Sequence, residues 1–278
     1  MTMTQQPCAK INLGLNVVSK RPDGYHNLET VFYPVNLKDE ISIEEVDNNI
    51  NTPYPCSLSI QGINIDGDLQ QNLIVKAYNL LKKYHKGIPN ISVTLTKNIP
   101  TQAGMGGGSS DCAYTIKMLN QMFNLNMSIK DMQTLAADLG ADCPFFINPV
   151  PSFATGIGEI LTPINISLAA YKIAIVKPPV MISTKEAFSN ISARKPTKCC
   201  RDIVMQPIET WKEELINDFE LSISSTHSEI IQIKNKLYDL GAIYASMTGS
   251  GSALFGTFNK ETKEDILKEF KDCYTCFA

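Results

Sequence analysis

The chain has 278 residues, of which 44% are hydrophobic and 19% charged, and its formal net charge is −3. This composition is typical of a globular protein long enough for two domains, and the small negative charge argues against a nucleic-acid-binding surface. No apolar run reaches the ~18 residues of a membrane-spanning helix, and the amino terminus lacks the features of a secretory signal. We therefore expect a cytoplasmic protein with reduced cysteines and neither a membrane nor a nucleic-acid partner.

Residues 9–18 alternate apolar and polar side chains, which predicts a β-strand with one apolar face. The polar face carries Lys10 and Asn12. Such a face is either solvated or lines a cleft. In a cleft, a lysine and an asparagine two residues apart would point toward an anionic substrate. The residues alone leave both alternatives open.

A tight turn at Pro22-Asp23-Gly24 follows, and Tyr25 and His26 lie just past it. Side chains in such places often contact ligands, although an aromatic residue and a histidine there are more often packing residues. The elements expected next are strands over residues 30–35, 41–44 and 58–61, a loop over 47–55, and a helix capped by Asn72 that ends before Gly87.

A glycine-rich loop, residues 100–111, follows a strand predicted over residues 91–96, with Ile91, Val93 and Leu95 facing inward. A helix begins after the loop near Ser109 or Ser110, and these serines can cap it. Glycines let the backbone approach a ligand closely, and the N–H groups at a helix start attract anionic oxygens. The loop lacks the lysine of the P-loop and the glycine spacing of the dinucleotide fingerprint. A flexible linker is the alternative, but the two strong flanking elements favour phosphate binding.

Ser128 is predicted to cap a second helix, with Asp131 in a weak capping box and Gly140 as the stop. Asp142 follows directly and leads into an apolar segment, which we interpret as a strand. Asp142 is then either a turn residue or a partly buried carboxylate that needs a cation partner. Lys10 is the candidate for that partner.

The sequence becomes loop-like over residues 148–159, which predicts a domain boundary between residues 152 and 153. The domains are then residues 1–152 and 153–278, and the second half has the pattern of an α+β sandwich. Its expected elements are a strand over 171–176, a short helix or turn over 184–190, and helices over 208–221, 228–240 and 262–270. Strands over 243–247 and 253–258 should form a hairpin, and a terminal strand should include Cys273 and Cys276. Residues 191–206 are basic and irregular.

Three segments together resemble the family of small-molecule kinases that includes galactokinase, homoserine kinase, mevalonate kinase and phosphomevalonate kinase, the GHMP kinases. They are Ala9-Lys10-Ile11-Asn12-Leu13, the loop from Pro100 to Asp111, and Met247-Thr248-Gly249-Ser250-Gly251-Ser252-Ala253. The resemblance implies an α+β fold of two domains with the site in the cleft between them. The first would be similar to domain 2 of ribosomal protein S5, and the second would be a ferredoxin-like α/β sandwich.

Within the family, residues 20–30, 104–111 and 140–146 resemble most the members that act on a cytidine diphosphate-linked methylerythritol in isoprenoid precursor synthesis. This implies an ATP-dependent kinase that phosphorylates an alcohol with the help of Mg²⁺, as a monomer or homodimer. A kinase for an alcohol of the homoserine or mevalonate type is the alternative, and a non-catalytic nucleotide-sensing module is a less favoured one. Residues 191–206 match the family least.

The resemblance also implies roles at the reacting end. Asp142 is similar to the base that accepts the proton of the substrate hydroxyl, and Lys10 to the partner that keeps this carboxylate ionised. Asn12 would contact the substrate nearby. The residues expected to hold the phosphates of ATP are Pro100, Gly104, Met105, Gly106, Gly107, Gly108, Ser109 and Ser110. Ser110 would also approach the Mg²⁺ ion.

At the other end of the substrate, the resemblance implies a site for the cytosine ring. Tyr25 and Phe188 would hold the ring between them, and His26 would bind its polar edge. Aromatic stacking combined with hydrogen bonds to the ring edge is how a pyrimidine is recognised without base pairing.

Overall fold

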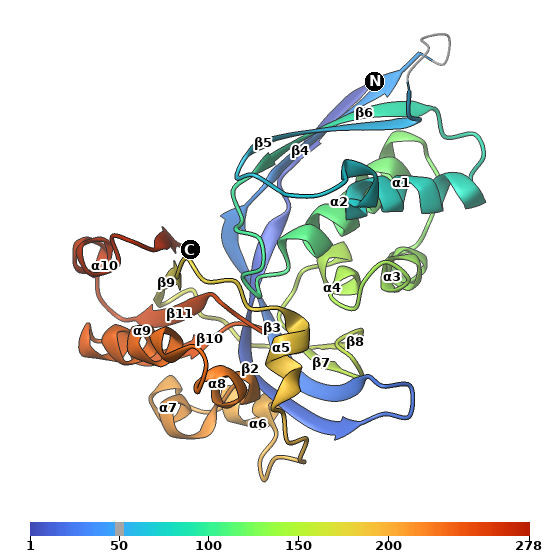
Figure 1. The fold of residues 1–278 in the computed structure, drawn as a ribbon. Helices are drawn as coiled ribbons and strands as arrows, with labels where there is room; N and C mark the ends of the chain where they lie inside the picture. Colours follow the sequence, from blue (N-terminus) through green and yellow to red (C-terminus); the bar gives the residue numbers. More distant parts are fainter. Residues whose placement is uncertain (48–52) are drawn as a thin grey trace. The chain divides into compact units, whose positions relative to one another are not determined.

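The computed structural model describes residues 1–47 and 53–278, which divide into two compact units (Figure 1). Unit 1 comprises Met1–Ala9, Leu37–Thr101 and Gly106–Pro149, and unit 2 comprises Lys10–Asn36, Gln102–Met105 and Val150–Ala278. The loop predicted over residues 47–55 lies partly outside the described residues. Because each unit is assembled from separate stretches of chain, the boundary between residues 152 and 153 stays a prediction.

Unit 1 contains a mixed sheet in the order β1-β4-β6-β5. Its strands are β1 (Thr2–Gln5), β4 (Glu40–Val46), β6 (Asn90–Lys97) and β5 (Cys56–Gly62). β1, β4 and β6 pair in antiparallel fashion, whereas β5 runs parallel to β6. Ile91, Val93 and Leu95 of β6 are buried, so the strand predicted at this place and its inward face are confirmed.

Helices cover one face of this sheet (Figure 1). They are α1 (Leu73–Tyr84) and α2 (Gly107–Met122). The helices α3 (Ile129–Ala137) and α4 (Cys143–Ile147) pack on α2, and the short 3-10 helix η1 (Leu69–Gln71) precedes α1. Asn72 caps α1 as predicted, because its side chain accepts a hydrogen bond from the N–H of Ile74 at 2.9 Å. The capping box of Ser128 and Asp131 at the start of α3 is also confirmed.

Unit 2 contains two sheets. The first has the order β2-β3-β7-β8, with β2 (Cys8–Lys20), β3 (His26–Lys38), β7 (Ser152–Thr155) and β8 (Ile160–Pro163). The second has the order β10-β11-β9-β12, with β10 (Tyr244–Met247), β11 (Leu254–Phe258), β9 (Lys172–Lys177) and β12 (Tyr274–Phe277). The strands of the second sheet are antiparallel to their neighbours, so β10 and β11 form the predicted hairpin.

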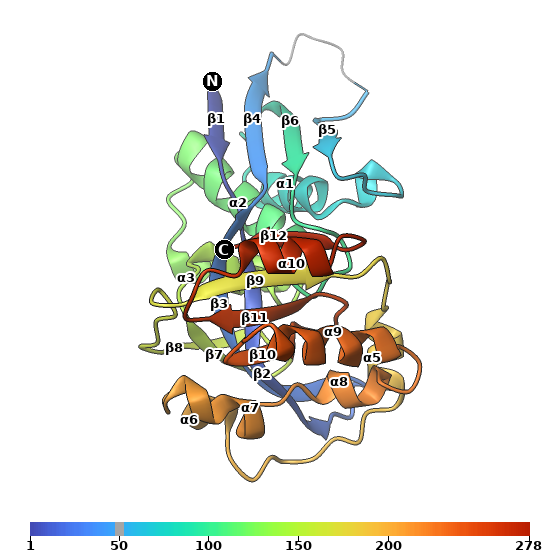
Figure 2. The same cartoon turned by 90° about the vertical axis from the view of Figure 1, so that its left-hand side faces the viewer.

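Helices of unit 2 pack on the second sheet. α9 (Ser228–Asp239) lies against β10 and β11, and α10 (Lys263–Glu269) lies beside β12 (Figure 2). The remaining helices are α5 (Thr184–Ser189), α6 (Cys200–Val204), η2 (Ile208–Thr210), α7 (Trp211–Glu214) and α8 (Asp218–Ile223). The core between helices and sheet includes Val176, Phe219, Ile230 and Leu254, all buried. Helices on antiparallel sheets confirm the α+β class.

Some predicted elements are wrong. The apolar segment after Asp142 is the helix α4 and not a strand. A short apolar run cannot be assigned by periodicity alone, and Pro144 in the first turn favours a helix start. α3 ends at Ala137, before the predicted stop at Gly140. Helical spacing places Ile129 on the apolar face of this helix, but Ile129 is 52% exposed.

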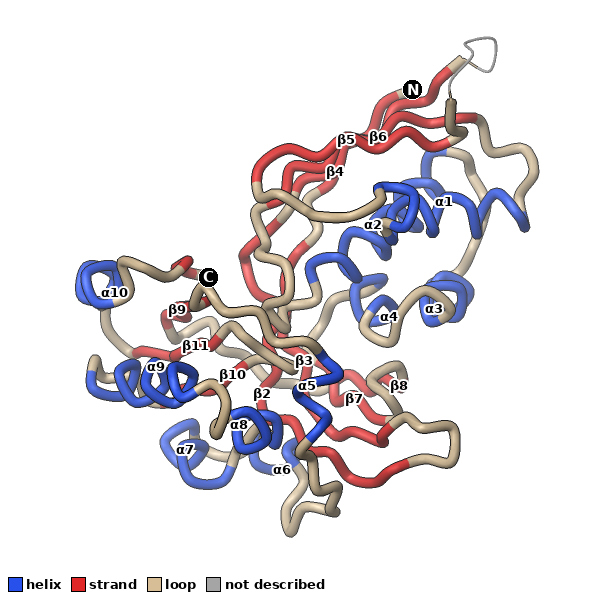
Figure 3. The backbone as a smooth tube through the Cα atoms, in the orientation of Figure 1, coloured by secondary structure: helices blue, strands red, loops and turns tan. Residues whose placement is uncertain are grey.

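The helix predicted over residues 208–221 is broken. Figure 3 shows α7 and α8 as separate helices joined by a loop. Asn217 caps α8, because its side chain accepts a hydrogen bond from the N–H of Phe219 at 3.0 Å. The basic segment 191–206 contains the short helix α6 at its end. Across the described helices, none has the length and apolarity to cross a membrane.

Candidate active site

Lys10 and Asn12 lie on β2, and their side chains are buried at 3% and 1% exposure. The polar face of this strand is therefore not solvated. The ammonium Nζ of Lys10 donates to Asn12 Oδ1 at 2.6 Å and to the carbonyl oxygen of Gly104 at 2.8 Å. It also lies 5.0 Å from the centre of the Phe32 ring. A buried ammonium needs such partners, and here one of them is supplied by the glycine loop.

The amide of Asn12 is held in one orientation by its neighbours. Its Oδ1 accepts from Lys10 and from the hydroxyl of Thr248, which lies 3.1 Å away. Its Nδ2 donates to Thr30 Oγ1 at 2.8 Å, and Thr30 in turn donates to the carbonyl of Gly14 at 2.5 Å. Donors face the oxygen and an acceptor faces the nitrogen, so a flipped amide would place donor against donor.

The glycine loop meets the loop between β10 and β11. Gly104 has φ +72°, and a Cβ added to it would lie 1.9 Å from the carbonyl oxygen of Thr248. The N–H groups of Ser252 and Ala253 donate to the carbonyls of Gln102 and Ala103, both at 3.3 Å. Only glycine fits this close approach of two backbones.

Unit 2 thus joins residues from all three segments that carry the family resemblance. The hydroxyl of Thr248 lies 3.1 Å from the carbonyl of Gly104, which also accepts from Lys10. The backbone N–H of Lys10 donates to the carbonyl of Met105 at 3.0 Å. Asn217 supports the third segment, because its buried amide donates to the carbonyls of Met247 and Gly249 at 2.8 and 2.9 Å.

The rest of the glycine loop belongs to unit 1 and starts α2. Gly106, with φ +71°, is the N-cap, so the prediction that Ser109 or Ser110 caps this helix is wrong. A glycine in the left-handed region turns the chain into the helix without a side-chain cap. The N–H of Ser110 donates to the carbonyl of Gly106 at 2.8 Å. The preceding N–H groups, including those of Gly107 and Gly108, have no intrahelical acceptor and are suited to anionic oxygens.

Pro100 and Gly107 are buried, Gly108 is exposed, and Ser109 is half-buried. The hydroxyl of Ser110 is buried, and within residues 1–47 and 53–278 it has no hydrogen-bond partner. A buried hydroxyl without a partner is rare, so Ser110 remains a candidate ligand.

A buried group of charges supports the first turn of α2. Lys97 forms ion pairs with Asp39 and with Asp111, the latter at 2.9 Å, and a Cβ added to Gly107 would lie 2.8 Å from the ammonium of Lys97. Two carboxyl groups share this one cation. Burial raises the pKa of Asp111 to about 7; the Lys97 charge opposes this shift, and the Asp39 charge adds to it.

Asp142 is half-buried and occupies the N-cap position of α4, where its side chain makes no capping hydrogen bond. It is followed by Cys143, which is buried at the first position of the helix. Asp142 belongs to unit 1 and Lys10 to unit 2. Their predicted ion pair therefore stays a prediction.

The aromatic residues predicted to bind the cytosine lie in unit 2. Tyr25 is 60% exposed, and its N–H donates to Asp23 Oδ1 in the preceding turn at 3.0 Å. The ring of His26 stacks on Phe188 with 4.8 Å between ring centres and 22° between planes. Phe219 packs against Phe188 edge-on, also at 4.8 Å. The structure brings His26 and Phe188 together, and binding of a ring between Tyr25 and Phe188 stays a prediction.

The chain matches two family models: the GHMP kinases N terminal domain over residues 72–148 and the GHMP kinases C terminal over residues 202–276. It is 50% identical over 255 residues to the 4-diphosphocytidyl-2-C-methyl-D-erythritol kinase of Bacteroides thetaiotaomicron, covering 92% of each chain. The protein of the same name from Parabacteroides distasonis is 44% identical, with 96% of each chain covered. The chain belongs to the GHMP kinase family.

Solved structures agree with this membership. A crystal structure of 4-(cytidine 5'-diphospho)-2C-methyl-D-erythritol kinase has a TM-score of 0.81 and 26% identity, covering 99% of this chain and 98% of that one. The structure of homoserine kinase from Cytophaga hutchinsonii has a TM-score of 0.71 and 15% identity, covering 100% of this chain and 93% of that one. At this identity, the similarity shows the shared fold alone. The predicted two-domain GHMP kinase fold is confirmed.

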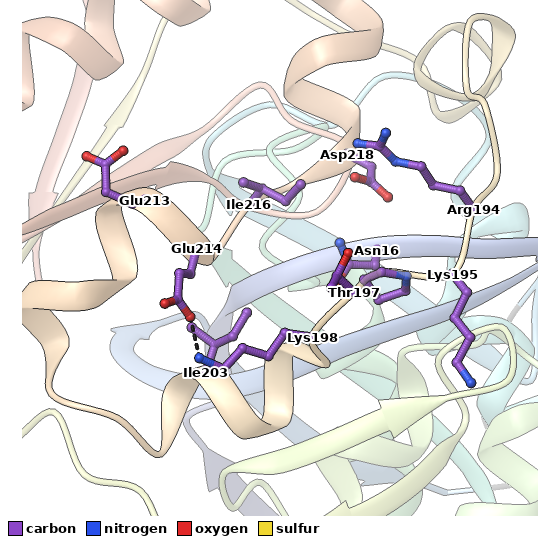
Figure 4. Close-up of a pocket in the computed structure, with 11 residues that line it drawn as sticks. Asn16, Arg194, Lys195, Thr197, Lys198, Ile203, Glu213, Glu214, Ile216 and Asp218 are labelled. Atoms are coloured by element: carbon purple, nitrogen blue, oxygen red, sulfur yellow. Dashed lines mark hydrogen bonds and ion pairs between the residues drawn. The ribbon is translucent and has the colours of Figure 1, made fainter.

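One pocket of this GHMP kinase was not predicted from the sequence. It measures about 430 Å³ and lies between β2 and the basic segment 194–198 (Figure 4). Lys198 is paired with Glu214 at 2.5 Å, and Lys195 points away from the other labelled side chains. Burial raises the pKa of Asp218, and the charge of Arg194 opposes this shift. Positive and negative groups are balanced here, so the lining does not favour an ion of either sign.

Sequence reasoning missed several supporting residues of the site. Thr248 was quoted only as part of a motif, and Thr30, Asn217 and Lys97 were not selected. An asparagine before a helix is a recognisable signal, so Asn217 could have been found as a cap. Its second function, holding the loop after β10, has no local signature because the carbonyls it contacts are 30 and 32 residues away.

Proposed function

We propose that this chain is an ATP-dependent kinase that phosphorylates the 2-hydroxyl of 4-diphosphocytidyl-2-C-methyl-D-erythritol, in the synthesis of isoprenoid precursors. The observation that carries the proposal is the 50% identity to a kinase of this name over 92% of both chains. The contacts that join Lys10, Gly104 and Thr248 support it, because they bring the family's motifs to one place.

Phosphoryl transfer depends on positioning and charge stabilisation more than on covalent catalysis. In this proposal, the N–H groups at the start of α2 hold the phosphates, and Lys10 stabilises negative charge beside them. Asp142 accepts the proton of the substrate hydroxyl. ATP supplies the phosphoryl group when bound. The proposal requires Lys10 and Asp142 to lie at the same phosphoryl group, which a crystal structure of a substrate complex would test.

Mg²⁺ is the expected cofactor of this reaction. Mg²⁺ is commonly held by one or two protein oxygens together with phosphate oxygens and water. The hydroxyl of Ser110 fits such a ligand, because it is buried and has no partner among the described residues. The described part of the chain contains no cluster of three or more His, Cys, Asp or Glu that could hold a metal by itself. Ser110 would therefore act together with the triphosphate.

Substrate selection would lie at Tyr25, His26 and Phe188. Tyr25 is exposed, so its ring is available to stack on a base. Because the His26 ring stacks on Phe188, we propose that His26 moves off this face when cytosine enters and then binds the polar edge of the base. A kinase for homoserine or mevalonate would have no use for these rings.

An ADP-release assay tests the function. We expect turnover with the cytidyl substrate and none with homoserine, mevalonate or water alone. Turnover with another alcohol only would favour the sibling kinase, and ATP binding without any ADP release would favour the sensing module. A cytoplasmic location and the choice between monomer and homodimer stay predictions.

The substitution Asp142→Asn tests the proposed base. It should lower kcat by roughly 10²–10⁴-fold while ATP binding is largely kept, because the carboxylate acts on the hydroxyl and not on the nucleotide. The matched control is Asp138→Asn, which changes an exposed carboxylate at the end of α3. Near-normal turnover of Asp142→Asn would remove this residue from the mechanism.

A further inference from the structure

We propose that Thr248 is a positioning residue for Lys10, and that it acts through Asn12 and Gly104. The inference rests on the proposed function, because Lys10 is there the group that stabilises the transferring phosphoryl. In the sequence, Thr248 is one residue of the third segment that resembles the family, and it carries no role of its own there. Its contacts single it out.

Thr248 and Lys10 share two acceptors. The ammonium of Lys10 donates to Asn12 Oδ1 at 2.6 Å and to the carbonyl of Gly104 at 2.8 Å. The hydroxyl of Thr248 lies 3.1 Å from each of the same two oxygens. It also accepts the backbone N–H of Asn12 at 3.1 Å. The side chain of Thr248 is fully buried.

The shared acceptors make the Thr248 hydroxyl a spacer between two chain segments. A hydroxyl has one hydrogen to donate, so it donates to one of the two oxygens at a time while it accepts from Asn12. It is thereby fixed to β2 on one side and to the glycine loop on the other. The ammonium of Lys10 bridges the same two segments, so its place depends on the distance that the hydroxyl maintains.

The orientation of Asn12 depends on the same hydroxyl. Thr30 fixes Nδ2 at one end of the amide, at 2.8 Å, and Thr248 and Lys10 fix Oδ1 at the other. Without the hydroxyl of Thr248, Asn12 Oδ1 keeps the ammonium of Lys10 as a donor but loses its second donor within residues 1–47 and 53–278, and the N–H of Asn12 loses the hydroxyl that accepts it. The amide can then rotate away from the ammonium, and the loop carbonyl of Gly104 can follow it.

This arrangement predicts a loss of turnover more than of ATP affinity. In transfer reactions, a displacement of about 1 Å at a reacting group can lower the rate by roughly 10²-fold. The N–H groups at the start of α2, which would hold the phosphates, are not contacts of Thr248. The KM for ATP should therefore change little when the hydroxyl is removed.

The experiment compares Thr248→Val, which keeps the shape and removes the hydroxyl, with Thr248→Ser, which keeps the hydroxyl. We expect kcat to fall by roughly 10–100-fold in the valine variant, with less than about a 3-fold change in the KM for ATP, and to be restored in the serine variant. Thr257→Val is the matched control, because Thr257, on β11, is as buried as Thr248 and its hydroxyl donates to the carbonyl of Tyr244 at 3.3 Å. The control should lose stability and keep kcat.

A second comparison asks whether Thr248 acts through Lys10. In a Lys10→Met background, Thr248→Val should have little further effect on kcat, because the group that it positions is gone. If Lys10→Met and Thr248→Val lower kcat by independent factors that multiply in the double variant, the proposal is overturned. Equal losses of kcat in Thr248→Val and Thr257→Val would also overturn it.

A crystal structure of Thr248→Val separates this inference from the proposed function, since it needs no substrate. We expect Nζ of Lys10 to leave one or both of its acceptors or the amide of Asn12 to rotate. An unchanged Lys10 and Asn12 would overturn the positioning role even if the enzyme phosphorylates the cytidyl substrate. A displaced Lys10 would support it even if the substrate proves to be another alcohol.

Discussion

Replacing Gly104 by alanine tests whether the contact between the two glycine loops is needed for folding and for catalysis. The new Cβ would lie 1.9 Å from the carbonyl oxygen of Thr248, where real Cβ contacts are not shorter than 3.0 Å, so the loops must separate by about 1.1 Å. The left-handed backbone of Gly104, with φ +72°, costs a non-glycine residue about 1–2 kcal/mol. Separation also weakens the charge-assisted hydrogen bond from Lys10, which contributes about 1.5–3 kcal/mol.

Together these effects predict that Gly104→Ala lowers the free energy of unfolding by about 2.5–5 kcal/mol. Because the carbonyl that moves is an acceptor of Lys10, kcat should also fall by roughly 10²-fold. Urea denaturation measures the first quantity, and the ADP-release assay measures the second.

Gly67→Ala is the control for backbone strain. Gly67 also has a positive φ, +110°, but a Cβ there would meet no atom within 4 Å. The control should show the backbone penalty without the loss of turnover. If Gly104→Ala is no less stable than Gly67→Ala and turns over at the wild-type rate, the close approach of the two loops is not a constraint and the reasoning is refuted.

Two further predictions concern the buried charges and the substrate end. Burial raises the pKa of Asp111 from 3.8 to about 7, so between these values the folded state holds a proton that the unfolded state has released. The contribution of Asp111 to stability therefore falls as the pH rises through this window. Urea denaturation measures the free energy of unfolding at about pH 5 and at about pH 8. Its decrease between these pH values should be smaller in Asp111→Asn than in the wild type. Equal decreases in the two proteins would contradict a buried, protonated Asp111 carboxyl. Tyr25→Ala should raise the KM for the cytidyl substrate about 10-fold while leaving the KM for ATP nearly unchanged, since stacking on a base contributes about 1–3 kcal/mol. An equal rise in both constants would argue against stacking.

The parts of the fold that the sequence predicted well are those with a local physical cause. The alternation of Ile91, Val93 and Leu95 reports a sheet face directly, and all three are buried. Asn72 and Ser128 cap their helices because a side-chain oxygen two or three residues ahead of an N–H is a local arrangement. Such elements need no knowledge of the rest of the chain.

The wrong predictions arose where a local rule has two outcomes. The run Cys143–Ile147 is apolar throughout, so periodicity could not separate a buried strand from a short helix. At the start of α2, serine is a better general N-cap than glycine, but Gly106 in the left-handed region turns the chain three residues before Ser109 could.

The candidate site shows a different limit. From the sequence, the polar face of β2 could be solvated or could line a cleft, because a lysine and an asparagine at alternate positions are compatible with both. Whether this face can be buried depends on hydrogen-bond acceptors from other parts of the chain. The loop carbonyl that accepts from Lys10 belongs to Gly104, 94 residues away in the sequence. Asn12 contacts Thr248, which is 236 residues away. Burying an ammonium without acceptors is unfavourable, so the buried position of Lys10 depends on acceptors that include the loop carbonyl of Gly104. The five residues at the start of the chain cannot report that contact, because the carbonyl lies far along the sequence.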